Sequence, residues 1–467
     1  MAVASVYPNY RQPKMRWLPA VPEHWNEQRA KTFFREVDER SKTGQEELLS
    51  VSHLTGVTSR SQKNVTMFKA ASYVGSKLCR PGDIVINTLW AWMAALGASR
   101  HVGIVSPAYG VYRPHHADSF NPAYLDYLLR TRAYVAEYIG RSTGIRSSRL
   151  RLYPNQFLDI ALIQPPRPEQ DQIVTYLRAQ DAHIARFIKA KRELIKLLTE
   201  QKLRIIDHAV THGLDASVAL KPSGIEWLGD VSVHWEVMSL KRACVRSALY
   251  GANIPATHYT DIGVRFLRTT DILESSRLKH GGVFLPGKMV SDYLLADGDI
   301  LLSRSGTIGR SFLFRADQHG QCSYAGYLVR FSPAKFLFPD FLFFYTKTRA
   351  FADFIKLNAI STTIENLNGD KYAKMAVPVP PLDEQRNICR WIADECQPLD
   401  DAITRTEDEI KLIREYRDRL ITDVVTGQVD VRGWQPGPED VVEDAVLAAL
   451  GDDQEEMTEQ EDDDDED

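Results

Sequence analysis

One stretch of 51 residues occurs twice in this chain, and it limits the possible folds more than any other feature. Residues 165–215 align without a gap on residues 380–430, and 15 of the 51 positions are identical. Both copies begin with Pro-Pro and, after two further residues, Glu-Gln. Two unrelated amphipathic helices would not share an ungapped register of this length. The chain therefore contains a structural unit that has been duplicated.

Both copies have the apolar spacing of a long helix. Apolar residues recur at steps of three, four and seven, which places them on one helical face, and over several heptads this pattern predicts a coiled coil. The paired prolines suit the start of a helix rather than its interior. About 40 helical residues make a rod of about 60 Å, whose apolar stripe is best covered by the other copy. The predicted seam consists of Ile173, Leu177, Ile184, Ile188, Ile195 and Leu198 with Ile388, Ile392, Leu399, Ile403, Ile410 and Ile413.

The second copy contains a proline where the first has His183. Because proline lacks an amide hydrogen and clashes with the preceding turn, Pro398 predicts a break or kink, with a fresh helical segment starting there.

The repeat extends beyond the helices. The segment from Trp17 to Trp25 returns as Trp227 to Trp235, with Leu, Val and His at the same places between the tryptophans. We interpret both segments as aromatic caps over the junction between helix and globular domain. A metal-ligand role for the histidines, His24 and its copy, is disfavoured, because no other ligand-type residues are nearby.

The globular segments also correspond in order, so the chain divides into five parts. The strand-like run Gly82–Ile86, for example, is matched by Gly298–Leu302. The predicted parts are a globular domain at 1–164, a helix at 165–216, a globular domain at 217–379, a helix at 380–432 and an acidic, disordered tail at 433–467.

The net charge of −5 hides a basic body. From Glu439 onward there are 16 acidic residues and no basic ones, and removing them leaves 57 basic and 46 acidic residues, a net charge of +11. A basic body with an acidic tail indicates a polyanionic partner. For the tail we consider two roles: a solvated segment that aids solubility, or a competitor of DNA for the basic surface.

A search for catalytic motifs finds none. His208 and His212 have metal-ligand spacing but lack the glutamate of the HExxH motif, and the second copy has Asp423 and Gly427 there. Residues 121–124 (Asn-Pro-Ala-Tyr) differ from the Asn-Pro-Pro-Tyr motif of amino-methyltransferases, and no glycine-rich cofactor loop precedes them. The five cysteines form no CxxC pair, which argues against zinc and disulfides. We expect no metal or cofactor. The one catalytic possibility that stays open is a nuclease site formed by carboxylates that the fold brings together.

Binding chemistry is better represented. Four arginines within residues 141–151 are mixed with small hydroxyl residues, and arginine can form paired hydrogen bonds to guanine in the major groove. The matching segment of the second domain, 361–368, is polar but not basic. The loops after strands 84–86 and 300–302 differ as well. The predicted DNA-binding residues are Arg60, Lys63, Asn87, Trp90, Arg141, Arg146 and Arg149 in the first domain, and Arg304, Arg310, Thr362, Asn366 and Lys371 in the second.

Several motifs together resemble one protein family. The PPxxEQ start of both helices, the Thr-Gly-Gln-Val-Asp-Val-Arg segment at 426–432 and the duplicated Trp-Leu…His-Trp frame resemble the specificity (S) subunits of type I restriction–modification systems. The resemblance covers about residues 17–432. It implies an α+β fold: two homologous α/β target-recognition domains, separated by two long helices in an antiparallel coiled coil, with an internal pseudo-two-fold repeat and, in this chain, an additional acidic tail.

The resemblance also implies function and partners. The subunit would read double-stranded DNA without an active site or cofactor of its own, and its helical spacer would dock two modification (methyltransferase) subunits. Those subunits would methylate adenine from S-adenosylmethionine, and restriction subunits, where present, would add ATP- and Mg-dependent translocation and cleavage. Because the loops of the two domains differ, we expect a bipartite, asymmetric target. With no leader or membrane-length apolar run in the sequence, we expect a cytoplasmic protein.

Three other functions are considered. A coiled-coil DNA-binding adaptor or regulator outside a restriction system shares every feature except the modification partner. A stand-alone methyltransferase–nuclease requires a cofactor loop and a catalytic tetrapeptide, which the sequence lacks. A coiled-coil adaptor that binds only proteins leaves the charge of the body unexplained.

Overall fold

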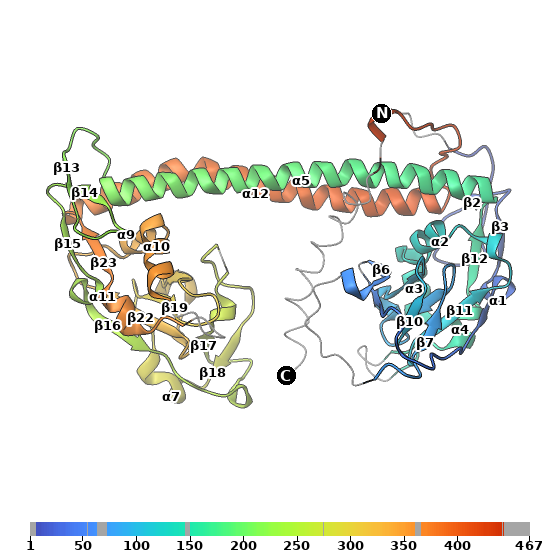
Figure 1. The fold of residues 1–467 in the computed structure, drawn as a ribbon, viewed down its shortest axis with the longest axis horizontal. Coiled ribbons are helices and arrows are strands. Elements are labelled where there is room, and N and C mark those ends of the chain that lie inside the picture. The colour runs from blue at the N-terminus through green and yellow to red at the C-terminus, as the bar shows by residue number, and fades with distance from the viewer. Residues whose placement is uncertain are drawn as a thin grey trace. The chain divides into compact units, whose positions relative to one another are not determined.

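The computed structural model describes residues 6–53, 55–62, 72–144, 150–273, 275–359, 366–440 and 442. The chain forms two compact units, unit 1 (Met1–Arg192 and Glu407–Asp467) and unit 2 (Glu193–Thr406). It passes from one unit to the other inside two long helices, α5 (Arg167–His212) and α12 (Leu382–Val425) (Figure 1). Each unit therefore contains one half of each long helix.

A four-stranded antiparallel sheet forms the centre of each unit. The strand orders are β4-β11-β8-β9 in unit 1 and β16-β22-β19-β20 in unit 2. In unit 1 the strands are β4 (Phe34–Glu36), β11 (Gly110–Pro114), β8 (Ile84–Ile86) and β9 (Leu96–Ala98). In unit 2 they are β16 (Cys244–Tyr250), β22 (Leu328–Pro333), β19 (Ile300–Ser303) and β20 (Ser311–Leu313).

The helices and a second strand pair also correspond between the units. A strand before the first short helix of each domain pairs with the strand that leads into the long helix: β3 (Asn26–Arg29) with β12 (Ala161–Gln164), and β15 (Glu236–Ser239) with β23 (Ala376–Val379). The short helices are α1 (Ala30–Phe33), α2 (Pro122–Leu129), α3 (Arg132–Arg141) and α4 (Pro154–Leu158) in unit 1, and α6 (Leu240–Ala243), α9 (Pro339–Tyr345), α10 (Arg349–Asn358) and α11 (Gly369–Lys374) in unit 2.

The remaining elements are short. Unit 1 contains β1 (Tyr10–Arg11), β2 (Val21–Pro22), β5 (Leu49–Ser52), β6 (Gly56–Ser59), β7 (Lys77–Cys79) and β10 (Gly103–Val105). Unit 2 contains β13 (Leu220–Pro222), β14 (Asp230–Ser232), β17 (Val264–Leu267), β18 (Val283–Leu285), β21 (Cys322–Tyr324), α7 (Gly287–Val290) and α8 (Ala316–His319). Strand β17 pairs with β18 and, in parallel, with β21.

Local sequence explains where several helices begin. The Asn121 side chain accepts hydrogen bonds from the amides of Ala123 and Tyr124, and Pro122 occupies the first turn of α2. Asparagine caps a helix N-terminus well, and proline there loses no hydrogen bond. The sequence Asn-Pro-Ala-Tyr is therefore a helix start in this fold.

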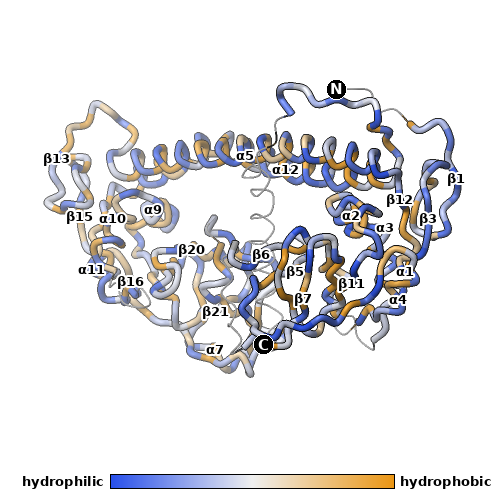
Figure 2. Tube along the Cα trace, turned by 45° about the vertical axis from the view of Figure 1, so that its right-hand side comes forward, coloured by the Kyte–Doolittle hydropathy of each residue, from blue (hydrophilic) through white to orange (hydrophobic). Residues whose placement is uncertain are grey.

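The core of each unit includes the ends of both long helices. In unit 1, Ile173 and Leu177 of α5 and Val424 and Val425 of α12 belong to one buried cluster with the domain's aromatic residues, among them Trp25. In unit 2 the corresponding cluster contains residues from the end of α5, the start of α12 and the second globular domain. Figure 2 shows apolar residues recurring along both helices. Because burial of apolar surface drives folding, the helices are integral to each domain.

Ion pairs fix the direction in which the two helices pack. In unit 1, Asp181 of α5 is 2.6 Å from Arg417 of α12, and Lys191 is 2.5 Å from Glu409. In unit 2, Lys202 Nζ is 2.6 Å from an oxygen of Asp400. Residue numbers fall on α12 as they rise on α5, so the paired halves run antiparallel within unit 1.

The predicted seam residues differ in burial. Those that are buried are Ile173, Leu177, Ile184, Ile188, Ile388, Ile392 and Ile410. Those that are only partly buried are Ile195, Leu198, Leu399, Ile403 and Ile413. The full seam stays a prediction. Burial is greatest near the globular domains, where a helix has neighbours besides its partner.

The predicted break at Pro398 is wrong. Helix α12 is a single helix of 44 residues with Pro398 inside it. A proline in a helix interior costs about 3 kcal/mol through one lost hydrogen bond and a clash. Here Ile392 and Cys396, just before the proline, are buried in the unit 2 core, and Asp400, just after it, pairs with Lys202. Tertiary packing on both sides of the proline offsets the local penalty.

Pro398→Ala is expected to stabilise α12. Alanine restores the amide hydrogen that the carbonyl of Asp394 lacks, and we expect local stability to rise by about 1–3 kcal/mol. Hydrogen–deuterium exchange of residues 392–404 measures this directly. Unchanged exchange would show that the proline is accommodated without cost, and faster exchange would show that it stabilises the helix.

The packed part of the chain continues into the predicted tail. Gln172 Nε2 donates to the carbonyl of Trp434 at 2.6 Å, and Arg186 donates to that of Glu439 at 2.9 Å. His183 Nε2 lies 2.7 Å from Asp440. Residues 434–440 thus lie along α5. The predicted disordered tail begins at residue 433, so the prediction is wrong for residues 434–440, which pack against α5. Beyond them, all residues except 442 lie outside the described residues.

Candidate nucleic-acid interface

A glutamine in the first turn of each long helix ties that helix to its globular domain. Gln170 Oε1 accepts a hydrogen bond from the amide of Asn121 at 2.7 Å, and Gln385 Oε1 accepts one from the amide of Phe338 at 2.7 Å. In both copies the amide nitrogen of the side chain donates to the carbonyl of the first of the paired prolines. The glutamine thus fixes the start of α2 or α9 against the start of the long helix.

The glutamate beside it holds the aromatic cap. Glu169 accepts a hydrogen bond from Trp25 Nε1 at 2.9 Å and lies 2.9 Å from His24 Nε2. Glu384 holds the tryptophan and histidine of the second copy in the same way, at 3.1 and 2.8 Å. The predicted aromatic caps are confirmed, and both histidines contact a carboxylate. The described residues contain no group of three or more His, Cys, Asp or Glu that could hold a metal ion.

Unit 1 adds a third donor to this clamp. The Tyr7 hydroxyl donates to Glu169 Oε1 at 2.5 Å, and the Arg432 guanidinium lies 4.7 Å from the centre of the Tyr7 ring. Burial, and then the hydrogen bond to Glu169, raise the pKa of Tyr7 well above its ordinary range. The Glu169 side chain is 6% exposed, whereas that of Glu384 is 30% exposed. Sequence reasoning missed Tyr7, because the segment before Trp17 has no counterpart with a recognisable pattern.

Some of the predicted DNA-binding residues lie on the loops after β8 and β19, and one backbone hydrogen bond, the backbone tie, holds these loops in the same way in both units. In unit 1 the amide of Leu152 donates to the carbonyl of Thr88, and in unit 2 the amide of Leu367 donates to that of Arg304, both at 2.9 Å. Each bond joins the loop after a central strand, β8 or β19, to the segment that precedes a short helix, α4 or α11. The fold therefore brings together the two segments of each domain that the sequence singled out separately.

In unit 2 this arrangement places Arg304 and Asn366 close together. Residues Ser305 and Asn366 form a β-bridge, and the Arg304 guanidinium lies 5.0 Å from the centre of the Tyr250 ring. Arg304 Nε and Asn366 Oδ1 are buried without a hydrogen-bond partner. A buried polar atom without a partner costs free energy. Tyr250 was missed, although an aromatic residue at the end of a strand is a usable signal.

The two other cations predicted in unit 2, Lys371 and Arg310, donate hydrogen bonds to backbone carbonyls of the protein itself. Lys371 Nζ donates to the carbonyl of Asn358 at 2.5 Å, and Arg310 Nη1 donates to that of Ile272 at 2.7 Å. Both cations are partly buried. Thr362 lies outside the described residues. Arg310 thus bonds the protein's own backbone, whereas the Arg304 guanidinium lies over the Tyr250 ring.

Among the predicted residues of unit 1 that the structure describes, Trp90 is the most accessible, at 40% exposure. Asn87 Nδ2 donates to the Tyr109 hydroxyl at 3.3 Å, and Arg141 Nε donates to Glu137 at 2.6 Å. Arg60 is partly buried at the start of a short 3₁₀ turn. Lys63, Arg146 and Arg149 lie outside the described residues. A DNA contact for any of the twelve residues stays a prediction.

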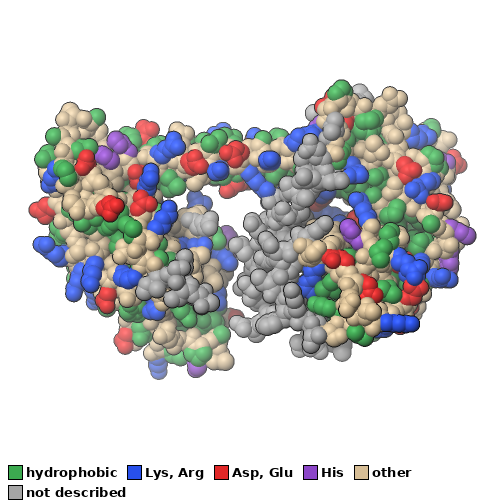
Figure 3. Space-filling view, viewed as in Figure 1, with side chains coloured by type: hydrophobic (Ala, Val, Ile, Leu, Met, Phe, Trp, Pro, Cys, Tyr) green, Lys and Arg blue, Asp and Glu red, His purple; other side chains and the backbone are tan. Residues whose placement is uncertain are grey.

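Buried ion pairs support the strands from which these loops extend. Arg113 Nε and Nη2 each lie 3.0 Å from an oxygen of Asp83, and Arg330 lies 3.7 Å from Asp299 at the same place in unit 2. Hydrogen bonds to Asp83 and Glu39 raise the pKa of Arg113 further above its ordinary value. On the visible face of each unit, Lys and Arg side chains are interspersed with Asp and Glu (Figure 3).

Comparison with known proteins identifies a family domain. Residues 269–412 match the family model described as Type I restriction modification DNA specificity domain. The chain is 24% identical over 328 residues to the putative type I restriction enzyme MjaX specificity subunit of Methanocaldococcus jannaschii, covering 68% of this chain and 70% of that one. It is 23% identical over 154 residues to the type I restriction enzyme EcoKI specificity subunit of Escherichia coli (strain K12). That match spans 32% of each chain, about a third of the EcoKI subunit's length.

A solved structure shares the fold. It is described as "Structural basis underlying complex assembly and conformational transition of the type I R-M system", and it superimposes with a TM-score of 0.57 at 16% identity. The alignment covers 88% of this chain and 99% of that one. Among the described residues no helix has the length and apolar character required to cross a membrane.

Proposed function

We propose that this chain, which is related to the type I restriction–modification specificity subunits and carries their DNA specificity domain, reads two different DNA half-sites, one with each unit. The observation that carries the proposal is the shared tie between the sheet loop and the segment before the short helix. The tie is the same in both units, Leu152 to Thr88 and Leu367 to Arg304, whereas the loop sequences differ. One scaffold with two sets of side chains is suited to a bipartite, asymmetric target.

The two long helices are proposed to act as the spacer, an antiparallel coiled coil related by a pseudo-two-fold axis. The continuity of α5 and α12 between the units, and the antiparallel ion pairs within unit 1, support this. Two-fold readers place half-sites about one helical turn of DNA apart, about 34 Å. The DNA between the half-sites would be spanned without being read.

The partners are proposed from the family. Two modification subunits would dock on the helical spacer and methylate adenine, and restriction subunits, where present, would supply ATP- and Mg-dependent cleavage. The chain would contribute recognition and no active site, and would work in the cytoplasm. A DNA-binding adaptor outside a restriction system is the second candidate. Methylation that depends on this chain and on a co-expressed modification subunit distinguishes the two.

Arg304→Ala is expected to weaken specific DNA binding by about 1–3 kcal/mol, or about 5- to 150-fold in Kd, because one base contact of arginine contributes this much. The preference for one particular base should be lost at one position of a single half-site. Selection of bound sequences from a random duplex pool measures this. Arg349→Ala is the control, because the Arg349 side chain is 86% exposed and lies outside both loops. Equal loss at both half-sites would argue that Arg304 acts on the fold.

Lengthening both helices together tests the spacer. We expect seven residues inserted after Arg192 in α5 and seven after Thr406 in α12 to add about 10 Å. The unread gap in the target should then grow by about three base pairs, while both half-sites stay the same. Sequencing of methylated adenines gives the gap. A changed half-site would refute the spacer role.

A further inference from the structure

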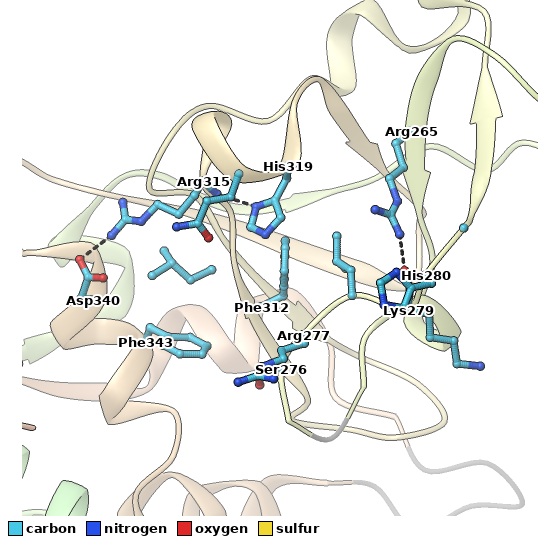
Figure 4. Close-up of a pocket in the computed structure, with 14 residues that line it drawn as sticks. Arg265, Ser276, Arg277, Lys279, His280, Phe312, Arg315, His319, Asp340 and Phe343 are labelled. Atoms are coloured by element: carbon cyan, nitrogen blue, oxygen red, sulfur yellow. Dashed lines mark hydrogen bonds and ion pairs between the residues drawn. The ribbon is translucent and has the colours of Figure 1, made fainter. Parts of the chain in front are cut away.

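Unit 2 contains a cavity of about 490 Å³ that is separate from the loops discussed above. Its walls come from β17, the segment that follows β17, β20, α8 and α9 (Figure 4). A cavity of this size is in the range that holds small organic ligands. Its most informative lining residues are Arg265, Arg277, Lys279, Arg315, His319 and Phe343.

The cavity has more positive than negative charge. Among the described residues, Arg265, Arg277 and Lys279 have no carboxylate partner in the structure, whereas Arg315 lies 2.5 Å from Asp340. Figure 4 places the Arg315–Asp340 pair on the opposite side of the cavity from Arg265. Charges removed from water are normally paired. Of these cations, Arg265 and Lys279 are partly buried and Arg277 is exposed. Because none of the three is paired with a carboxylate among the described residues, the cavity favours an anionic ligand.

Arg265 is held in place but incompletely bonded. Its Nη2 donates to the carbonyl of Lys279 at 2.7 Å, while its buried Nε has no hydrogen-bond partner. Gly282, at φ +125°, leaves room for the guanidinium, because a Cβ there would lie 3.1 Å from Nε. The protein accommodates this side chain at the cost of an unmet donor at Nε, which is too deeply buried for a ligand to reach. A bound anion would instead accept hydrogen bonds from the terminal guanidinium nitrogens.

The other side of the cavity is aromatic. The rings of Phe312 and His319 lie 5.0 Å apart, and Phe343 faces the cavity from α9. His319 Nδ1 accepts the amide of Arg315 at 3.0 Å, so the neutral ring carries its proton on Nε2. Burial, with the charge of Arg265 contributing, lowers the pKa of His319 and favours this neutral form. The surface is suited to the flat, weakly polar part of a ligand.

The segment that carries Arg277 is shaped by a strained residue. Ser276 has a φ of +60°, which is uncommon for a residue other than glycine. Its hydroxyl accepts a hydrogen bond from Lys347, whose Nζ also donates to Ser311 at 2.6 Å. Burial lowers the pKa of Lys347 to about 8. Strained backbone held by buried contacts is typical of ligand sites.

The shared scaffold does not require this cavity. In unit 1, β9 ends at Ala98 and β10 begins at Gly103, so four residues connect the two strands. In unit 2, eight residues connect β20, which ends at Leu313, to β21, which begins at Cys322. The longer connection contains α8 and supplies the wall formed by Arg315 and His319.

We propose that this cavity binds the phosphate of a nucleotide, with the phosphate on Arg265 and Arg277 and the nucleoside against His319 and Phe343. Guanidinium groups bind phosphate through paired hydrogen bonds, and aromatic side chains stack on bases. The nucleotide is either free in solution or part of a DNA strand. If the nucleotide is part of a DNA strand (the DNA source), the proposal rests on the proposed function. If the nucleotide is free in solution (the free source), it does not.

Titration calorimetry of the full chain with adenosine 5′-monophosphate, adenosine and inorganic phosphate tests the free source. We expect saturable binding of the monophosphate, tighter than that of either fragment, and weakened about tenfold or more by Arg277→Gln. Among the described residues the Arg277 side chain makes no hydrogen bond or ion pair, and its backbone carbonyl, which accepts from the amide of Leu273, is unchanged by the substitution, so this variant should fold normally. Arg265→Gln should act in the same direction, and Arg349→Gln should have no effect.

Binding of a random-sequence duplex at several salt concentrations tests the DNA source. If the DNA strand is the ligand, Arg277→Gln lowers the slope of log affinity against log salt by about 0.9, and the free monophosphate does not bind. The proposal is overturned if both arginine variants leave monophosphate binding and the salt slope as in the unaltered chain. Failure of the unaltered chain to bind any duplex would contradict the proposed function, while the monophosphate titration would still test the cavity.

Discussion

Arg417→Ala is expected to destabilise unit 1 by about 3–5 kcal/mol, the cost of breaking a buried ion pair by removing one partner. Arg417 bonds Asp181 through two nitrogens, at 2.6 and 3.2 Å, and the Tyr127 hydroxyl donates to the same carboxylate at 2.8 Å. The Asp181 side chain is only 7% exposed. Without the guanidinium, the carboxylate is left charged in a poorly hydrated place, held by one neutral donor.

The matched control is another ion pair between the same two helices. Lys191 and Glu409 also join α5 to α12, but the Glu409 side chain is 50% exposed. Lys191→Ala should therefore cost about 1 kcal/mol or less. Because a chain with two units need not unfold in one step, hydrogen–deuterium exchange of residues 173–188 is the suitable measurement. Equal effects of the two substitutions would mean that burial does not determine the strength of these pairs.

Glu169→Ala is expected to loosen the cap of unit 1 by about 3 kcal/mol or more. The substitution leaves the Trp25 indole, the Tyr7 hydroxyl and the His24 ring without their shared acceptor. A buried donor left without a partner costs about 1–3 kcal/mol. Amide exchange over residues 21–29 and 167–177 should rise, because the clamp joins these two segments.

Glu384→Ala supplies the comparison within the same molecule. Glu384 holds two donors instead of three and is 30% exposed, so water can replace it in part. We expect a loss of about 1–2 kcal/mol, confined to residues 231–239 and the start of α12. A larger effect at Glu384 than at Glu169 would show that the third donor and the deeper burial of the first clamp contribute little.

The long helices could be predicted from the sequence because their signal is local and occurs twice. Periodic apolar residues and the paired prolines located the starts of α5 and α12 to within two residues, but α12 ends at Val425, seven residues before the predicted end at 432. Pro398 was misjudged for the converse reason. Its effect depends on the buried residues that precede it and on the Asp400–Lys202 pair that follows, and helical propensity contains no information about either.

The candidate interface was predictable in position but not in detail. Matching the two copies located the loops after β8 and β19 and the segments that lie beside them, as the Thr88–Leu152 and Arg304–Leu367 bonds show. A positive charge in a sequence, however, does not reveal its partner. Arg310 bonds a backbone carbonyl, whereas Arg304 lies over Tyr250. The identical Glu-Gln pairs were visible, but their clamp depends on donors distant in sequence.

The most direct test of the account is to co-express the full chain with its modification subunit and to sequence the methylated adenines of the host DNA. The account predicts a single motif made of two different half-sites at a fixed separation, with the intervening bases free to vary. One contiguous motif, two identical half-sites, or methylation independent of this chain would contradict the claim that two copies of one scaffold hold two unlike readers.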